Sequence, residues 1–102
     1  MFGTVARMQV KPGKLEELKA LIDEDDARAV EGYVASVVYQ STADLDEFWL
    51  TVIFKDRKAY EANANDPSQD DLYRRLRALL DSDPEWHDGE VVYATKGAWS
   101  QG

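Results

Sequence analysis

Two apolar stretches decide the fold: YVASVVYQS at Tyr33–Ser41 and EFWLTVIFK at Glu47–Lys55. Both are rich in the β-branched and aromatic residues that favour strands. The short polar connection between them, Thr42–Asp46, is typical of a hairpin. The sequence therefore predicts two neighbouring antiparallel strands in the middle of the chain.

The residues before this hairpin predict a strand and a helix. Residues of Phe2–Val10 alternate between two faces, and Lys11–Gly13 breaks the strand. Leucines at helical spacing begin at Leu15, so a helix is expected from there to the Glu31–Gly32 pair. Gly32 suits the left-handed conformation that often follows a helix.

The residues after the hairpin predict two more helices and a strand. Asp56 can cap a short helix that runs to about Asn65, and Asp66 can cap a second one that Asp83-Pro84 ends. A last strand is expected at Glu90–Thr95. The order is strand, helix, strand, strand, helix pair, strand. It predicts an α+β, ferredoxin-like βαββαβ fold: a four-stranded antiparallel sheet with its helices on one face.

The chain is short and acidic, which limits its function. Its 102 residues correspond to one domain, expected over residues 1–95, with residues 96–102 as a C-terminal tail. A formal net charge of -8 argues against nucleic-acid and anionic-membrane partners. The absence of cysteine excludes disulfides and thiolate chemistry. We find no secretory signal in Met1–Val10 and therefore expect a cytoplasmic protein.

Apolar residues occupy both faces of the hairpin strands. Phe48, Leu50 and Val52 can face the helices, yet Trp49 and Ile53 lie on the opposite face. In the other strand, Tyr33, Ala35, Val37 and Tyr39 share one face. Helices on one side cannot cover the second apolar face, so the expected partner is a second copy of the chain, in a homodimer through the sheet faces.

The sequence resembles a known family at two places. Val10-Lys11-Pro12-Gly13-Lys14, and then Phe54-Lys55-Asp56-Arg57-Lys58-Ala59-Tyr60 after the hairpin, are similar to the antibiotic biosynthesis monooxygenase (ABM) domains. The resemblance runs from about Phe2 to Ala94. It implies a dimeric α/β barrel, with a ligand pocket between sheet and helices in each subunit.

The resemblance does not extend to the haem-degrading branch of the superfamily. The positions that match its functional residues without gaps are Ala6, Asn63 and Tyr73, none of which is the residue required there. Two further departures are Phe54, where the family often has Trp, and Asn63, where relatives often have His. We therefore expect no cofactor. One histidine without cysteines also predicts no metal site.

Four residues are candidate catalytic groups: Asn63, Tyr60, Tyr73 and His87. Small alanines beside Tyr60 and Asn63 leave room for a ligand, and the Asn63 amide can orient a phenol or stabilise an oxyanion. The alternative is that Tyr60 fills the space and Asn63 caps a helix end. His87 lies among carboxylates that can raise its pKa toward the range of a general base; the alternative is a loop histidine before the last strand.

Three functions remain open on the sequence. The first is a cofactor-independent monooxygenase that acts on a small hydroxylated aromatic or quinol, as the resemblance implies. The second is a dimer on the same fold that binds a small ligand without catalysis, in sensing or stress response. The third is an isomerase or cyclase that uses His87 or a tyrosine as its base. Tyr33, Trp49, Tyr60 and Tyr73 are suited to stacking a planar aromatic ligand.

Overall fold

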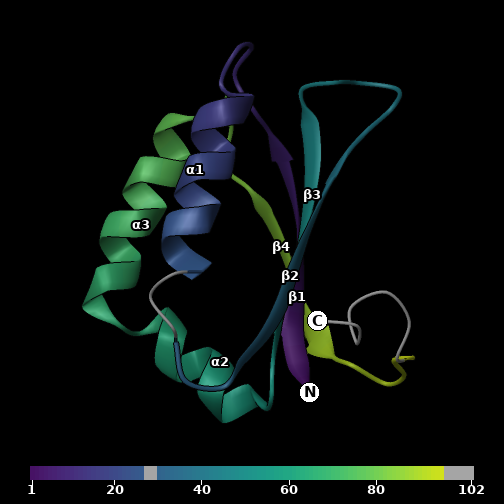
Figure 1. Ribbon diagram of the computed structural model, residues 1–102, viewed down its shortest axis with the longest axis vertical. Helices are drawn as coiled ribbons and strands as arrows, with labels where there is room; N and C mark the ends of the chain where they lie inside the picture. The colour runs from purple at the N-terminus through teal and green to yellow at the C-terminus, as the bar shows by residue number, and fades with distance from the viewer. Residues whose placement is uncertain (27–29, 96–102) are drawn as a thin grey trace.

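The computed structural model describes residues 1–26 and 30–95, and its elements follow the expected order. These are β1 (Phe2–Gln9), α1 (Leu15–Asp26), β2 (Tyr33–Gln40), β3 (Glu47–Phe54), α2 (Arg57–Ala64), α3 (Pro67–Ala78) and β4 (Glu85–Glu90). The strands form one layer, and the helices lie together on one side of it (Figure 1). The ferredoxin-like α+β fold predicted from the sequence is confirmed.

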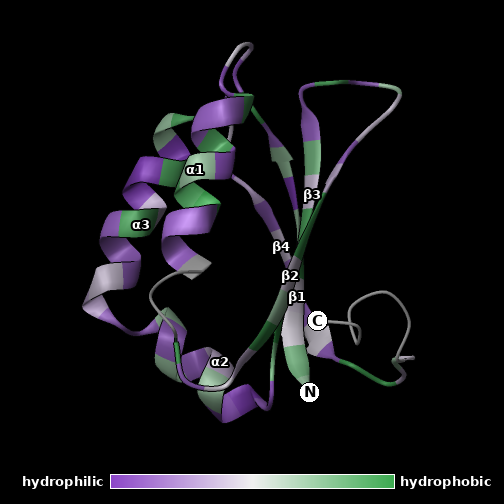
Figure 2. Ribbon diagram, viewed as in Figure 1, coloured by the Kyte–Doolittle hydropathy of each residue, from purple (hydrophilic) through white to green (hydrophobic). Residues whose placement is uncertain are grey.

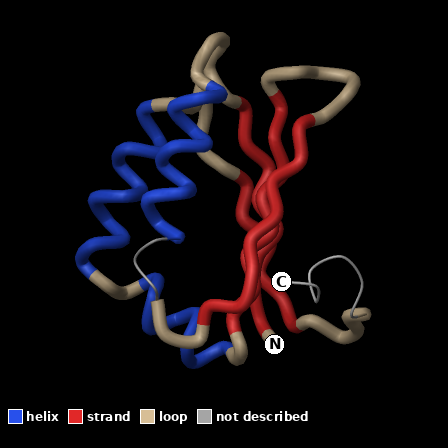
Figure 3. The backbone as a smooth tube through the Cα atoms, in the orientation of Figure 1, coloured by secondary structure: helices blue, strands red, loops and turns tan. Residues whose placement is uncertain are grey.

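The sheet is antiparallel throughout, with the strand order β2-β3-β1-β4. The two strands β1 and β3 therefore occupy the centre, and β2 and β4 are the edges. Figure 3 shows the strands as one layer beside the helices. The predicted hairpin forms between β2 and β3, closed by a hydrogen bond from the Ser41 amide to the Glu47 carbonyl (2.9 Å). This order places β4 beside β1, at one edge of the sheet.

The core lies between the sheet and the helices. On β1, Phe2, Ala6 and Met8 are buried, while Val5 on the alternate face is 40% exposed. A cluster of buried residues joins the layers: Ala6, Met8, Val10, Leu18, Phe48, Leu50 and Leu80. The apolar positions follow this inner surface of helices and strands (Figure 2). Strand alternation thus assigns one face of the sheet to the core.

Two aspartates begin the helices α2 and α3. Asp56 precedes α2 and accepts a hydrogen bond from the Ala59 amide (2.8 Å). Asp66 precedes α3, with Pro67 in the first turn, and accepts one from the Ser68 amide (2.9 Å). Both satisfy amides that have no partner inside the helix. The predicted helix starts are therefore confirmed.

The last strand differs from its prediction. It runs over Glu85–Glu90, and not over Glu90–Thr95. The sequence VVYAT has the higher strand propensity, but in the structure Val92 and Tyr93 are 94% and 80% exposed. The polar segment EWHDGE forms the strand because it pairs in register with β1, where Thr4 lies opposite Asp88 and Ala6 opposite Trp86. Tertiary pairing overrides local propensity here.

An irregularity in β2 changes the face of Tyr33. Between Tyr33 and Ala35 the register with β3 shifts, so that Tyr33 lies opposite Phe54 while Ala35 lies opposite Ile53. Such a bulge moves a side chain to the other face. Tyr33 therefore lies on the helix side, and its predicted grouping with Ala35, Val37 and Tyr39 is wrong for this one residue.

Two other predictions concern the ends of elements. Gly32 has φ 81°, the left-handed conformation expected for it. It lies in a turn that leads directly into β2, in which the Tyr33 amide donates to the Val30 carbonyl (3.2 Å). The described part of α1 ends at Asp26, and residues 27–29 lie outside the described residues. The predicted tail at 96–102 also lies outside them. In the part of the chain that the structure describes, no helix is long and apolar enough to cross a membrane.

Candidate functional site

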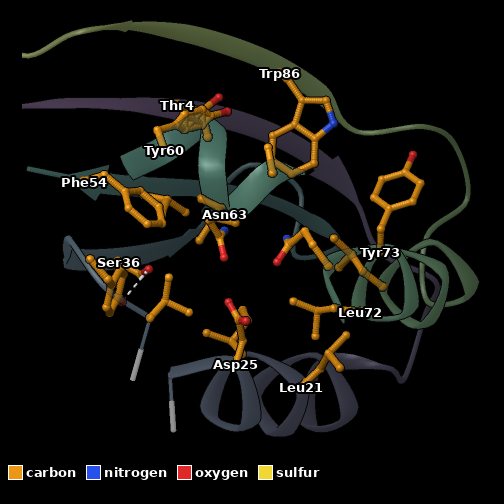
Figure 4. A pocket seen from close by; sticks show the side chains of 18 of the residues that line it. Thr4, Leu21, Asp25, Ser36, Phe54, Tyr60, Asn63, Leu72, Tyr73 and Trp86 are labelled. Carbon is orange, nitrogen blue, oxygen red and sulfur yellow. Dashed lines mark hydrogen bonds between the residues drawn. The ribbon is translucent and has the colours of Figure 1, made fainter. Parts of the chain in front are cut away.

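A cavity of about 640 Å³ lies between the sheet and the three helices (Figure 4). Its walls are mostly apolar. They include Leu18 and Leu21 from α1, Leu50 and Phe54 from β3, and Leu72 from α3. The size is in the range of small-molecule sites, which run from about 300 to 1,000 Å³. The cavity can therefore hold a small, largely apolar molecule.

Tyr60 provides the best-defined polar group of the cavity. Its ring packs against Phe2 (5.1 Å between centroids) and Phe54 (5.8 Å). Its hydroxyl donates a hydrogen bond to Oδ1 of Asp88 on β4 (2.9 Å). Burial is the main cause that raises the pKa of Tyr60, to about 12, and the neighbouring Asp88 carboxylate adds to it. Tyr60 therefore keeps its proton at neutral pH and offers it to an oxygen acceptor.

Thr4 lies next to Tyr60 and Asp88. It is directly opposite Asp88 in the β1–β4 register, and it lines the cavity close to Tyr60 (Figure 4). Its Oγ1 is buried without a hydrogen-bond partner of regular geometry. The hydroxyl is near enough to the Tyr60 phenol to lower its pKa, against the larger upward effects. Thr4, Tyr60 and Asp88 form one polar cluster at the β4 edge, which we call the edge cluster.

The bulge in β2 places a second pair of polar side chains in the cavity wall. Because it turns Tyr33 to the helix side, the Tyr33 hydroxyl can donate to Oγ of Ser36 (2.7 Å). Both residues line the cavity, on the side away from the edge cluster. The Tyr33 ring also meets Phe54 edge-on at 5.9 Å. The register shift thus separates Tyr33 from the face of Ala35, Val37 and Tyr39 and places it in the cavity wall.

Asn63 and Tyr73 reach the same cavity from the helices. Asn63, in the last turn of α2, directs its amide into the space, and Asp25 of α1 points toward it from the other side (Figure 4). Tyr73 of α3 and Trp86 of β4 also line the cavity. Tyr73 is 37% exposed and Trp86 43% exposed. Their rings can therefore contact a ligand that enters from solvent.

The structure brings together three of the four candidate catalytic residues, Tyr60, Asn63 and Tyr73. His87 is apart from them. It is a residue of β4 opposite Val5, and it alternates with the cavity residues Trp86 and Asp88, so it faces the outer side of the sheet. The expectation that His87 lies in a loop before the last strand is wrong, because this strand already begins at Glu85. No group of three or more metal-ligating side chains occurs among residues 1–26 and 30–95.

Two other outer-face residues, Trp49 and Arg7, lie away from the cavity. Trp49 lies opposite Arg7 on the outer face and does not line the cavity, unlike the other three aromatic residues expected there. Arg7 forms ion pairs within its own chain, with Glu47 (2.6 Å) and Glu85 (3.1 Å). Sequence reasoning assigned neither Asp88 nor Trp86 to the cavity. The two-residue alternation within EWHDGE would have found both, had the strand been placed there.

The structure defines a ferredoxin-like protein with an apolar cavity between sheet and helices. The profile of the antibiotic biosynthesis monooxygenase family matches residues 1–75, so the chain belongs to this family. The resemblance found in the sequence is thereby confirmed. A comparison with curated protein sequences gave no match.

Solved structures agree with this fold. A candidate antibiotic biosynthesis monooxygenase from Chloroflexus aurantiacus is 27% identical, with a TM-score of 0.74 over 92% of this chain and 95% of that one. SnoaB from Streptomyces nogalater, a cofactor-independent oxygenase, is 16% identical, with a TM-score of 0.79 over 91% and 94%. A conserved protein from Methanosarcina mazei is 22% identical, with a TM-score of 0.75 over 86% and 89%.

Proposed function

We propose that the chain is a cofactor-independent monooxygenase that acts on a small hydroxylated aromatic or quinol. The observation that carries this proposal is the apolar cavity of about 640 Å³ with phenol and amide groups directed into it. Membership of the monooxygenase family and the likeness to a cofactor-independent oxygenase support the reaction class. A substrate of this kind supplies its own electrons to O2, so the protein needs to bind, orient and exclude water.

The proposed roles follow from position. Asn63 orients the substrate hydroxyl and donates to the oxyanion formed when that hydroxyl loses its proton. The phenol oxygen of Tyr60 accepts a hydrogen bond from a substrate hydroxyl, because the proton of this phenol is donated to Asp88. Tyr73 and Trp86, which line the cavity and are partly exposed, pack against the aromatic plane of the substrate. His87 has no part in this proposal, since its side of the sheet does not face the cavity.

The proposal is tested with 1,4-naphthohydroquinone and O2, without added cofactor. One oxygen atom enters the ring and the other leaves as water, so C10H8O2 and O2 give C10H6O3 and H2O. Heavy-isotope oxygen gas and mass spectrometry distinguish this hydroxylated quinone from the simple quinone of spontaneous oxidation. We expect protein-dependent label in the product and faster O2 uptake. Tight binding of the hydroquinone without labelled product would instead support the non-catalytic ligand-binding alternative.

A further inference from the structure

The edge cluster connects the cavity to solvent through a short series of oxygen atoms. Tyr60 lines the cavity, and its hydroxyl donates to Oδ1 of Asp88 at 2.9 Å. Asp88 is an exposed residue on an edge strand, so water reaches its carboxylate directly. The phenol therefore has one side toward a ligand and the other toward a carboxylate that exchanges protons with bulk water.

We propose that Asp88 is the proton acceptor of the site, and that a ligand hydroxyl in the cavity passes its proton to Asp88 through the phenol of Tyr60. This inference rests on the proposed function in one respect, that the ligand carries an acidic aromatic hydroxyl. It assigns a role to a residue that sequence reasoning did not select. It also identifies the direction in which the proton leaves the cavity.

The step balances without any other reactant. The ligand hydroxyl donates a hydrogen bond to the Tyr60 oxygen. The ligand proton then moves to the Tyr60 oxygen while the proton of Tyr60 moves to the carboxylate of Asp88. The ligand becomes an oxyanion, Tyr60 is again a neutral phenol, and Asp88 becomes a carboxylic acid. One negative charge is present before and after the transfer. Asp88 then releases its proton to water, because its own side chain is exposed.

Three features of the cluster suit this transfer. Burial raises the pKa of Tyr60 to about 12, so the phenol works by passing a proton on and does not hold the negative charge itself. The Phe2 and Phe54 rings fix the phenol in place. The buried Thr4 hydroxyl, which has no regular partner, can donate to the phenol oxygen when negative charge develops on it during the transfer.

The other carboxylates of the cavity are less suited. Asp25 and Asp70 line it from α1 and α3, whereas the hydrogen bond of the Tyr60 phenol goes to Asp88 on β4. Glu90 lies two residues after Asp88, so it is on the same face of β4, but it is outside the cavity lining. Glu90 is therefore a matched control for removal of one charge from this strand.

The test uses alizarin, a planar hydroxylated anthraquinone whose colour changes when it loses its first phenolic proton. The full-length protein is saturated with alizarin at acidic pH, and ionisation of the bound dye is followed after a jump to neutral pH in a stopped-flow instrument. We expect Asp88→Asn to slow this ionisation by about 100-fold, the typical contribution of a positioned acid or base. Glu90→Gln should ionise the dye at the wild-type rate.

A second variant separates proton acceptance from structure. Asp88→Ala leaves a gap at an exposed edge. Added acetate can occupy this gap and accept the proton, so it should restore fast ionisation in proportion to its concentration. Equal rates for wild type and Asp88→Asn, or no effect of acetate on Asp88→Ala, would overturn the relay. Failure of the wild type to bind alizarin would also overturn it, because the relay would have no ligand.

Turnover separates this inference from the proposed function. If bound alizarin ionises through Asp88 but naphthohydroquinone gives no labelled product, the relay stands and the monooxygenase proposal fails. If labelled product forms at the same rate in wild type and Asp88→Asn, the monooxygenase proposal stands and the relay fails.

Discussion

The hydroxyl of Tyr60 donates to the carboxylate of Asp88 across 2.9 Å and so joins α2 to the edge strand β4. The two residues are 28 positions apart in the sequence. The bond exists because Tyr60 lies on the sheet-facing side of α2 and Asp88 alternates to the helix side of β4. The pair contributes to the stability of the fold as well as to the cavity.

The first prediction concerns the pH dependence of stability. The pKa of Tyr60 is about 12 in the folded chain, against an ordinary value of 10.0. A raised pKa means that the unfolded chain ionises this tyrosine first, so the stabilisation is complete below pH 10.0 and is lost as the pH rises toward about 12. Urea unfolding on both sides of this pH window should show that the free energy of unfolding falls more in wild type than in Tyr60→Phe. Equal losses would contradict the assignment.

The second prediction concerns two glycines that lie opposite each other. Gly3 on β1 pairs with Gly89 on β4, but their surroundings differ. A Cβ on Gly3 would collide with the backbone oxygen of Val52, whereas a Cβ on Gly89 would meet nothing within 4 Å. Gly3→Ala should therefore lower the free energy of unfolding by about 2 to 3 kcal/mol. Gly89→Ala, its matched control, should change it by less than about 0.5 kcal/mol.

The third prediction is a homodimer through the outer sheet face. Val37, Thr51, Val5 and His87 form a row across all four strands on this face. Val5 and Val37 are 40% and 38% exposed in the single chain, which leaves apolar surface for a second copy. Val5→Glu should weaken the dimer by roughly 3 kcal/mol or more, because an unpaired carboxylate would be desolvated.

Sedimentation velocity checks the dimer. Wild type should sediment as a dimer at micromolar concentration and Val5→Glu as a monomer. Val38→Glu, on the opposite face of β2, should leave the dimer intact. Ile53 is unsuitable for this test, because it is already only 6% exposed within one chain, and a charge there would disturb the fold itself. A wild-type protein that stays monomeric would refute the prediction.

The sequence predicted elements well where local and tertiary preferences agree. The hairpin of Tyr33–Ser41 and Glu47–Lys55 combines strand propensity with turn chemistry, and it forms as expected. The boundary of β4 could not be predicted, because the apolar residues 91–95 have the stronger local signal. Only the register with β1 selects Glu85–Glu90. The same register places Asp88 and Trp86 on the cavity side, so one boundary error hid both residues.

The site was predictable in its helical part and on the β3 face that carries Leu50 and Val52. Helical spacing places Tyr60 and Asn63 on adjoining parts of one face, and both line the cavity. The face of Tyr33 depends on a single-residue register shift, which leaves no signal in a run of nine strand-forming residues. The face of His87 depends on the true strand boundary. Strand periodicity cannot assign a side chain to a face of the sheet where a register shift of one residue moves that side chain to the opposite face.

The fourth prediction is that haem does not bind in a functional one-to-one complex. Haem iron is commonly held by an imidazole or a thiolate that faces its pocket. The one histidine of the chain, His87, faces the other side of the sheet, and there is no cysteine. Haemin titration should therefore give no sharp Soret shift at stoichiometric protein. A saturable shift followed by haem loss on addition of ascorbate would contradict this prediction.

The last prediction tests the role of Asn63 in the proposed oxygenation. Its amide is directed into the cavity from α2 and offers both a donor and an acceptor to a substrate oxygen (Figure 4). Asn63→Ala should lower turnover of naphthohydroquinone, or affinity for it, at least about tenfold, which corresponds to ~1.4 kcal/mol for one hydrogen bond to a charged oxygen. Asn65→Ala is the matched control, because Asn65 ends α2 through its backbone and lies outside the cavity lining. Thermal unfolding should show that both variants remain folded. If Asn63→Ala and Tyr60→Phe both retain wild-type turnover, the oxyanion is stabilised elsewhere, and the role proposed for this side of the cavity is wrong.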